Sequence, residues 1–250
     1  MDFTRLHALT YTAFSSLNKK AMDLYAMPVR VQHKEDGSPV SSADIELNTL
    51  ITQVLKSITP TIMAVSEENY PALPVSSPSL FWLIDPIDGT RAFISKKGVF
   101  TLNAGLIYKG CPLFGVVASP LMGDIYIGSP LGAFKNGWKI YARRVPSSGA
   151  TLTMSKPRGN SITPQDIADK WAILHPVADC IYNTSSIKIC AIAEGRADFY
   201  ASWHPLSSWD TAAAHAVLRY AGGSIVDING QEVSYCLSTA RNPDFLCRGL

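Results

Sequence analysis

Apolar residues recur at intervals of three or four along the beginning of the chain, and a second such run follows further on. The first run comprises Phe3, Leu6, Leu9, Ala13, Leu17, Ala21 and Leu24. The second comprises Ile45, Leu50, Ile51, Val54, Leu55 and Ile58. Because this spacing places the apolar side chains on one face of an α-helix, both runs predict amphipathic helices that pack against a core.

Short apolar runs after these two segments predict strands. Residues 62–65 and 80–84 are such runs, and we expect Pro86 to end the second strand because proline has no N–H to donate. Between residues 100 and 134, further apolar runs are separated by Lys109-Gly110, Met122-Gly123 and Leu131-Gly132. Glycine between such runs is typical of turns, so this region predicts antiparallel strands.

A polar segment that contains Pro and Gly, residues 143–149, separates this region from the rest of the chain. Such a composition is typical of a connection between structural units. We expect an N-terminal α+β subdomain over residues 1–143 and a C-terminal α/β subdomain over residues 144–250. The C-terminal part predicts the order strand, helix, strand, helix, strand.

Composition narrows the possible functions only slightly. The chain of 250 residues is 47% hydrophobic, and its formal net charge of +2 comes from scattered Lys and Arg without a long basic block, which neither indicates nor excludes nucleic acid. No apolar run reaches the roughly 18 residues of a membrane span. The first ten residues lack the pattern of a signal peptide. Five cysteines without close paired spacing suit a reducing cytoplasm, where we expect the protein.

The most informative segment is WLIDPIDGTR, which runs from Trp82 to Arg91. Asp85 and Asp88 follow an apolar strand and should emerge together at its carboxyl end, where open α/β sheets keep their sites. Two carboxylates this close repel each other unless one is protonated or a cation lies between them. Hard divalent ions such as Mg²⁺ prefer oxygen ligands of this kind, so the segment predicts part of a metal site.

Two further acidic clusters supply candidate ligands. Glu67 and Glu68 follow the strand predicted over residues 62–65, and Asp210 stands where a helix begins. Each cluster also has an ordinary structural interpretation. The two glutamates would suit a solvated surface, and Asp210 would suit a helix N-cap.

Together, three motifs in this order resemble the inositol monophosphatase superfamily of Mg²⁺-dependent, Li⁺-sensitive phosphatases. The motifs are SEE at residues 66–68, WLIDPIDGTRAFI at 82–94 and WDTAAAHAVLRYAGG at 209–223. The resemblance covers nearly the whole chain and implies an α/β fold, the layered αβαβα sandwich of the inositol monophosphatase and fructose-1,6-bisphosphatase type. Four other segments resemble the bacterial 3'(2'),5'-bisphosphate nucleotidase branch, namely residues 34–44, 98–121, 185–200 and 241–245.

The resemblance also implies roles for individual residues. It implies that two or three Mg²⁺ ions are bound by the side chains of Glu67, Asp85, Asp88 and Asp210 and by the backbone carbonyl of Ile87. Thr90 and Asp44 would orient the attacking water, with Glu67 also serving catalysis. Asp44 equally suits a capping arrangement with Ser41 at the start of the second predicted helix. Gly89 and Thr90 would begin a short helix whose N–H groups face the substrate phosphate, or Gly89 would be a simple turn glycine.

Substrate contacts are implied for Ser185, Ser186, Lys188 and Asp210. A lone lysine on a helix would otherwise be expected on a solvated face. The chain departs from the nucleotidase branch at residues 201–204, Ala-Ser-Trp-His, where the branch has an Arg that can hold a phosphate with two parallel hydrogen bonds. Arg158, Arg91 and His204 are the candidate replacements.

Three functions follow from this resemblance. The first is a Mg²⁺-dependent phosphatase that removes the 3'(2')-phosphate of adenosine 3'(2'),5'-bisphosphate, a step in sulfur metabolism. The second is a related phosphatase for inositol phosphate, histidinol phosphate or a sugar phosphate. The third is a non-catalytic protein that binds RNA or a polymerase, and the retained acidic residues argue against it. We expect a small phosphate ester as partner rather than a nucleic acid polymer, and a homodimer by analogy.

Overall fold

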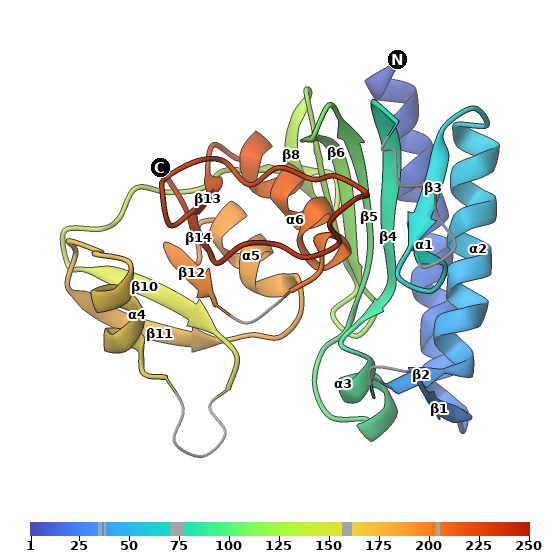
Figure 1. Cartoon of the computed structure of the whole chain (residues 1–250), viewed down its shortest axis with the longest axis horizontal. Helices are drawn as coiled ribbons and strands as arrows, with labels where there is room; N and C mark the ends of the chain where they lie inside the picture. Colours follow the sequence, from blue (N-terminus) through green and yellow to red (C-terminus); the bar gives the residue numbers. More distant parts are fainter. Residues whose placement is uncertain (35–36, 38, 71–77, 157–161, 204–205) are drawn as a thin grey trace.

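The computed structural model describes residues 1–34, 37, 39–70, 78–156, 162–203 and 206–250. Within these ranges the elements form alternating layers of helices and sheets (Figure 1). The helices are α1 (Phe3–Ala26), α2 (Ser42–Ile58), α3 (Thr90–Ser95), α4 (Pro164–Lys170), α5 (Ile187–Ala193) and α6 (Ser208–Tyr220). The strands are β1 (Val31–His33), β2 (Pro39–Ser41), β3 (Met63–Ser66), β4 (Leu80–Asp88), β5 (Thr101–Tyr108), β6 (Cys111–Ser119), β7 (Asp124–Ser129), β8 (Gly132–Lys135), β9 (Trp138–Ile140), β10 (Ala150–Met154), β11 (Val177–Tyr182), β12 (Phe199–Ser202), β13 (Ser224–Asp227) and β14 (Phe245–Arg248).

The two helices predicted from the apolar periodicity are confirmed as α1 and α2, which lie side by side as the first layer (Figure 1). Asp2 caps α1 by accepting a hydrogen bond from the Arg5 N–H at 3.1 Å. Ser41 and Asp44 cap α2 reciprocally, each side chain accepting from the other residue's backbone N–H. These caps place the start of α2, and with it Asp44, at a defined position beside the sheet.

The second layer is a seven-stranded sheet in the order β3-β4-β5-β6-β7-β8-β9. Strands β3 and β4 are parallel, and every later neighbour is antiparallel. The antiparallel strands predicted between residues 100 and 134 are therefore confirmed, with turns at the predicted Gly-containing positions. The short hairpin of β1 and β2 lies apart from this sheet, near α3 (Figure 1).

Strand β4 is apolar without alternation because helices cover both faces of the sheet. Trp82 and Ile84 belong to the core shared with α1 and α2. Phe81 and Leu83 belong to the core shared with α5 and α6 on the opposite face. Because side chains alternate along a strand, Asp85 continues the face of Leu83 and points toward the α6 layer.

The prediction that Pro86 ends the strand is wrong, since β4 continues to Asp88. The register with β5 shifts at this point, because Asp85 pairs with Asn103 whereas Asp88 pairs with Thr101. One extra residue is thus accommodated in β4 as a bulge, where an N–H for the ladder is not required. The bulge lies between the two aspartates, Asp85 and Asp88, that the sequence singles out.

The C-terminal part forms the remaining three layers, with α5 and α6 between the two sheets (Figure 1). The second sheet has the order β11-β10-β12-β14-β13, and α4 packs on it through Ile167. The predicted order of strand, helix, strand, helix, strand matches β10 to β12 but was incomplete, since α6, β13 and β14 follow. The arrangement of helix, sheet, helix, sheet and helix layers is the predicted αβαβα sandwich.

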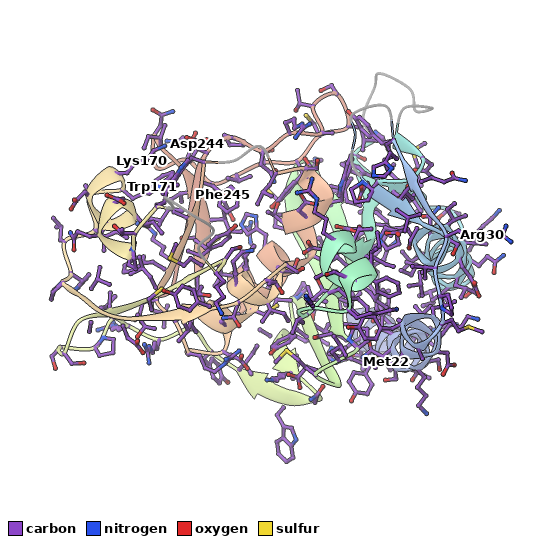
Figure 2. All side chains as sticks on the ribbon, turned by 90° about the horizontal axis from the view of Figure 1, so that it is seen from below. Met22, Arg30, Lys170, Trp171, Asp244 and Phe245 are labelled. Carbon is purple, nitrogen blue, oxygen red and sulfur yellow. The ribbon has the colours of Figure 1, made fainter. Side chains whose placement is uncertain are left out.

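An ion pair joins the outermost helix to the second sheet. Lys170 Nζ at the end of α4 lies 3.2 Å from an Asp244 carboxylate oxygen, just before β14. Figure 2 shows these residues together with Trp171 and Phe245, far from Met22 and Arg30 on the opposite side of the molecule. The α4 layer therefore lies on the side of the molecule opposite Met22 of α1 and Arg30, which precedes β1.

None of the helices in the described ranges combines the length and the apolar character needed to cross a membrane. All five cysteines carry free thiols, in agreement with their unpaired spacing in the sequence. The division predicted at residue 143 lies in the connection between β9 and β10, and two independent subdomains remain a prediction.

Candidate metal and phosphate site

The predicted acidic residues meet where β3, β4 and α6 end or begin. The N–H of Glu67, just after β3, donates to the Ile84 carbonyl at 3.0 Å, which aligns this residue with the end of β4. Asp85 lies on the α6 face of β4, and its carboxyl group interacts with that of Asp210. Two carboxyl groups this close repel each other unless a proton or a cation lies between them.

Asp88 is held by donors from two other segments. Its Oδ2 accepts the Ser186 N–H at 2.7 Å, the Thr101 hydroxyl at 3.3 Å and the Asn103 amide at 3.4 Å. Its backbone carbonyl accepts the Ser185 hydroxyl at 2.8 Å. The segment before α5 and the strand β5 thus fix the orientation of this carboxylate.

Asp210 occupies the first turn of α6 but is not the N-cap. Ser207 is the N-cap, and Asp210 Oδ2 accepts the Ser207 N–H at 2.7 Å in a capping box. Asp210 therefore takes part in capping the helix, as the sequence indicated, but the N-cap itself is Ser207. The carboxyl group of Asp210 also interacts with Asp85. One side chain therefore both caps α6 and belongs to the acidic cluster.

Asp44 and Thr90 contact each other across 46 residues of sequence. The Thr90 hydroxyl lies 3.3 Å from Asp44 Oδ1 and 3.1 Å from the Ile87 carbonyl oxygen. The other Asp44 oxygen accepts from the Ser41 N–H at 2.7 Å. The capping interpretation of Asp44 is therefore confirmed. Its other oxygen faces Thr90, and the role of both residues in orienting water stays a prediction.

Lys34, from the end of the hairpin strand β1, neutralises part of the cluster. Its Nζ lies 2.7 Å from Glu67 Oε1 and 3.0 Å from Glu68 Oε1. Burial opposes the charged ammonium, yet its contacts with Glu67 and Glu68 raise the pKa of Lys34 above its usual range. Glu68 is therefore not a freely solvated surface charge, because an ion pair holds it beside Glu67.

Burial raises the pKa of every carboxyl group in the cluster, and repulsion between carboxylates adds to this effect for Glu67, Asp85 and Asp210. Burial is the largest cause for Glu67, Asp85, Asp88 and Asp210. Repulsion from neighbouring carboxylates adds to it for Asp85, and for Asp210 the two effects raise the pKa to about 8. The site therefore carries more buried negative charge than its protein donors compensate, which is the electrostatic situation that a bound cation relieves.

The donor set fits a hard divalent cation. Four carboxylates from three segments, with the Ile87 carbonyl between two of them, are the oxygen ligands that Mg²⁺ prefers. In the present arrangement, no three acidic, His or Cys side chains of the described residues gather closely enough to hold an ion. In this arrangement Lys34, Ser186 and Ser207 each donate a hydrogen bond to one of the carboxylates, Glu67, Asp88 and Asp210 respectively.

The uncompensated negative charge of the site should appear in the pH dependence of thermal stability, measured in the presence of a chelator. Because the pKa of Asp210 is about 8 in the folded chain against 3.8 as its reference, the folded state binds more protons between these values. The Asp210 carboxyl group therefore contributes to the stability of the folded chain at low pH, and this contribution is lost as the pH rises through about 8. We expect the melting temperature in EDTA to fall between about pH 5 and pH 8.

The control for this measurement is Asp210→Asn, which should flatten the dependence of the melting temperature on pH. Saturating Mg²⁺ should also flatten it, since a cation replaces the proton between the carboxylates. A melting temperature in EDTA that rises over this pH interval, or an unchanged slope in the variant, would contradict the electrostatic assignment.

A cavity of about 210 Å³ adjoins the carboxylates. It is lined by residues of α3, α5, α6, β12 and the connections before them, namely Asp88, Gly89, Arg91, Ala92, Thr184, Ser185, Lys188, Ile189, Tyr200, Leu206, Asp210 and Thr211. Gly89 is the N-cap of α3 and has φ +99°, a left-handed conformation that favours glycine. A Cβ at this position would lie 2.7 Å from Ser185 Oγ, so a larger residue would displace this hydroxyl group.

Lys188 is buried, and the expectation of a solvated face is wrong for this residue. Its Nζ lies 5.1 Å from the centre of the Tyr200 ring and 3.4 Å from Ser155 Oγ. Burial lowers the pKa of Lys188, against the opposing attraction of Asp88 and Asp210. The side chain was expected in solvent because helical periodicity alone does not reveal that a second sheet covers α5.

Comparison with known proteins agrees with this geometry. A sequence profile of the inositol monophosphatase family matches residues 5–244. The chain belongs to the inositol monophosphatase family. It is 35% identical over 214 residues to the 3'(2'),5'-bisphosphate nucleotidase CysQ of Salmonella typhimurium, covering 84% of this chain and 85% of the relative. The corresponding protein of Escherichia coli K12 is 34% identical over 211 residues, covering 83% and 84%.

Solved structures of the inositol monophosphatase family share the fold. CysQ from Bacteroides thetaiotaomicron superposes with a TM-score of 0.77 at 26% identity, over 96% of this chain and 97% of that protein. A dual-specificity inositol monophosphatase/NADP phosphatase bound with D-inositol-1-phosphate superposes with a TM-score of 0.81 over 100% and 92%, at 16% identity. The predicted fold class and family are thereby confirmed.

Two residues at this inositol monophosphatase site had no role assigned from the sequence. Lys34 lies in the first of the segments that resemble the nucleotidase branch, but nothing in its spacing indicates a contact 33 positions away. Tyr200 ends the segment of residues 185–200 and lies against Lys188. An aromatic residue in an apolar strand is ordinarily a core residue, so only the covering of α5 by β12 reveals its position.

Proposed function

We propose that this chain is a divalent-metal-dependent phosphatase of adenosine 3'(2'),5'-bisphosphate that releases the 3'(2')-phosphate. The observation that carries the proposal is the buried carboxylate cluster beside a cavity that also contains Gly89, Ser185 and Lys188. Negative groups on one wall and phosphate-binding groups on the other are what metal-assisted hydrolysis of a phosphate ester requires.

Glu67, Asp85, Asp88 and Asp210, with the Ile87 carbonyl, are the groups proposed to hold Mg²⁺. A divalent cation supplies the acidity that makes water a nucleophile near neutral pH and the positive charge needed for in-line displacement at phosphorus. Two or three ions per site, and inhibition by submillimolar to millimolar Li⁺, are part of the same proposal. Lys34 donates to Glu67 Oε1, so the other oxygen of this carboxylate is the one proposed to take up a ligand role.

Asp44 and Thr90 are proposed to orient and deprotonate the attacking water. The Thr90 hydroxyl accepts a hydrogen bond from the water and donates its own proton toward Asp44 Oδ1, 3.3 Å away. Burial raises the pKa of Asp44, although hydrogen bonds from Ser41 oppose this effect, and a raised pKa suits a group that takes up a proton near neutrality.

The scissile phosphate is proposed to lie between Gly89 and Lys188. The left-handed Gly89 allows close approach of the backbone, and the buried Lys188 ammonium provides a positive charge. Ser185 lines the same cavity. The Ser186 hydroxyl donates to the Asp210 carbonyl at 3.0 Å, and its N–H donates to Asp88, so Ser186 joins the substrate side of the site to both acidic segments.

The choice of substrate is supported by the relatives. Those at 34–35% identity over most of their length are named 3'(2'),5'-bisphosphate nucleotidases. The departure at residues 201–204 lies partly outside the described residues, as do His204 and Arg158. Arg91 is the candidate replacement cation that the structure describes, and it lines the cavity.

A substrate panel tests the proposed function. Purified enzyme with Mg²⁺ should show a kcat/KM for adenosine 3',5'-bisphosphate at least about tenfold above those for inositol 1-phosphate and histidinol phosphate, because a charge-assisted hydrogen bond to the second phosphate contributes about 1.5–3 kcal/mol. A preference for either monoester would overturn the assignment of substrate. Full activity in excess EDTA would overturn the metal-dependent mechanism.

One observation favours a second candidate, a phosphatase for a compact monoester such as inositol phosphate. The cavity beside the carboxylates has a volume of about 210 Å³, below the roughly 300 Å³ at which ligand pockets usually begin. The panel above separates the two candidates. The homodimer remains a prediction.

A further inference from the structure

A second depression adjoins the cavity at the carboxylates. It has a volume of about 320 Å³ and is lined by Val31, His33, Gly37, Pro39, Arg91 and Ile94. These residues belong to the β1–β2 hairpin, the turn inside it and α3, which lie near one another at the same end of the molecule (Figure 1). Arg91 lines both the cavity and this groove, so the two depressions meet at this residue.

The volumes indicate that the cavity at the carboxylates alone does not hold a whole nucleotide. The cavity at Asp88 and Lys188 encloses about 210 Å³, which suits a phosphate and the atoms next to it. Ligand pockets usually enclose roughly 300–1,000 Å³, and the cavity and the groove together fall within this interval. A nucleoside attached to a phosphate at the carboxylates therefore extends past Arg91 into the groove.

The distribution of charge singles out the same residue. Lys34 is already paired with Glu67 and Glu68. Lys188 is buried and compensates Asp88 and Asp210. Arg91 is exposed, and among the described residues its guanidinium forms no ion pair with a carboxylate, so it remains available to an anion.

We propose that Arg91 is a specificity-determining residue, whose guanidinium binds the second phosphate of a nucleoside bisphosphate while the nucleoside lies in the groove between α3 and the β1–β2 hairpin. This inference rests on the proposed function and identifies where the non-reacting part of the substrate, the second phosphate and the nucleoside, is bound. A guanidinium holds a phosphate with two parallel hydrogen bonds and keeps its charge at all physiological pH values. Val31, Pro39 and Ile94 offer the groove the apolar surface that a sugar and base require.

The decisive experiment compares two substrates that differ only in the second phosphate. Arg91→Gln, Arg91→Lys and the wild type are assayed with adenosine 3',5'-bisphosphate and with adenosine 3'-monophosphate. We expect Arg91→Gln to lower kcat/KM for the bisphosphate by roughly 10- to 100-fold, mainly through KM, and to change that for the monophosphate less than about twofold. The lysine variant should fall between the two, since it keeps the charge and loses the paired geometry.

Inhibition by adenosine 5'-monophosphate, which retains the second phosphate, provides a readout that is independent of turnover of the bisphosphate. Its inhibition constant on the monophosphate substrate should rise in Arg91→Gln by the same factor as KM. Lys97→Gln is the matched control, because Lys97 is an exposed cation just after α3 that lines neither depression. This control should leave both substrates unchanged.

Three results would overturn the assignment of Arg91. They are an equal loss on both substrates, no loss on the bisphosphate, and an equal effect of Lys97→Gln. The proposed function fails by a different result, in the wild type alone, if the unmodified enzyme prefers inositol 1-phosphate or histidinol phosphate. The two failures are therefore distinguishable.

Discussion

Replacement of Asp88 by Asn is expected to lower kcat by at least about a thousandfold while the chain remains folded. Asp88 combines one carboxylate of the proposed metal site with a place in the cavity wall. Metal assistance contributes several kcal/mol to the stabilisation of the transition state, and a loss of about 4 kcal/mol corresponds to this factor. Asparagine has nearly the same shape but carries no charge, so the change tests the charge itself.

The folded state should tolerate this substitution. The Asn side-chain oxygen can still accept the Ser186 N–H that Asp88 accepts at 2.7 Å. Burial, the largest cause, raises the pKa of Asp88, so the ionised form destabilises the folded chain in the absence of a cation. We therefore expect the melting temperature in EDTA to be equal to or above that of the wild type.

Asp179→Asn is the matched control, since Asp179 is exposed on β11 and lies outside the cavity lining. It should keep full activity. The measurements are steady-state kinetics at saturating Mg²⁺ and thermal unfolding with and without EDTA. Activity within tenfold of the wild type in Asp88→Asn would remove this carboxylate from the mechanism.

The acidic cluster could be predicted from the sequence because its members stand near the ends of regular elements. Asp85 and Asp88 come after the apolar run that forms the first part of β4, and Asp210 stands in the first turn of a helix. Chain direction and periodicity locate such residues at element ends, and the ends of neighbouring strands lie together. The convergence thus follows from local patterns and from the order of motifs that resembles a known family.

The lysines that compensate the negative charge of the acidic cluster could not be predicted in the same way. Lys34 reaches Glu67 from a hairpin outside the main sheet, and Lys188 is buried because the second sheet covers its helix. Both facts depend on contacts between layers, which leave no periodic signal in the chain. The continuation of β4 past Pro86 is of the same kind, because the bulge is defined only against β5.

The close packing of α6 on the seven-stranded sheet also leaves no periodic pattern in the sequence. Gly105, Gly115 and Gly128 lie on β5, β6 and β7, inside apolar runs where glycine has no turn to form. A Cβ at each of these positions would come closer than 3.0 Å to backbone atoms of α6. The sheet therefore requires glycine at three crossings so that the helix carrying Asp210 can approach.

Gly115→Ala is accordingly expected to destabilise the chain by at least about 3 kcal/mol, which lowers the melting temperature by roughly 10 °C. The added carbon would overlap the Ala213 carbonyl, a backbone atom that only a shift of α6 can move. Gly123→Ala is the control, because its Cβ would meet nothing within 4 Å and its φ of +70° adds only about 1–2 kcal/mol of strain.

Since α6 also positions Asp210, the folded fraction of Gly115→Ala should need a higher Mg²⁺ concentration for half-maximal activity, whereas Gly123→Ala should not. The measurements are thermal unfolding and Mg²⁺ titration of activity. A melting temperature of Gly115→Ala equal to that of Gly123→Ala would show that the sheet yields instead of the helix. If Gly115→Ala is strongly destabilised but needs no more Mg²⁺ than the wild type, the packing of α6 at this glycine does not determine the position of Asp210.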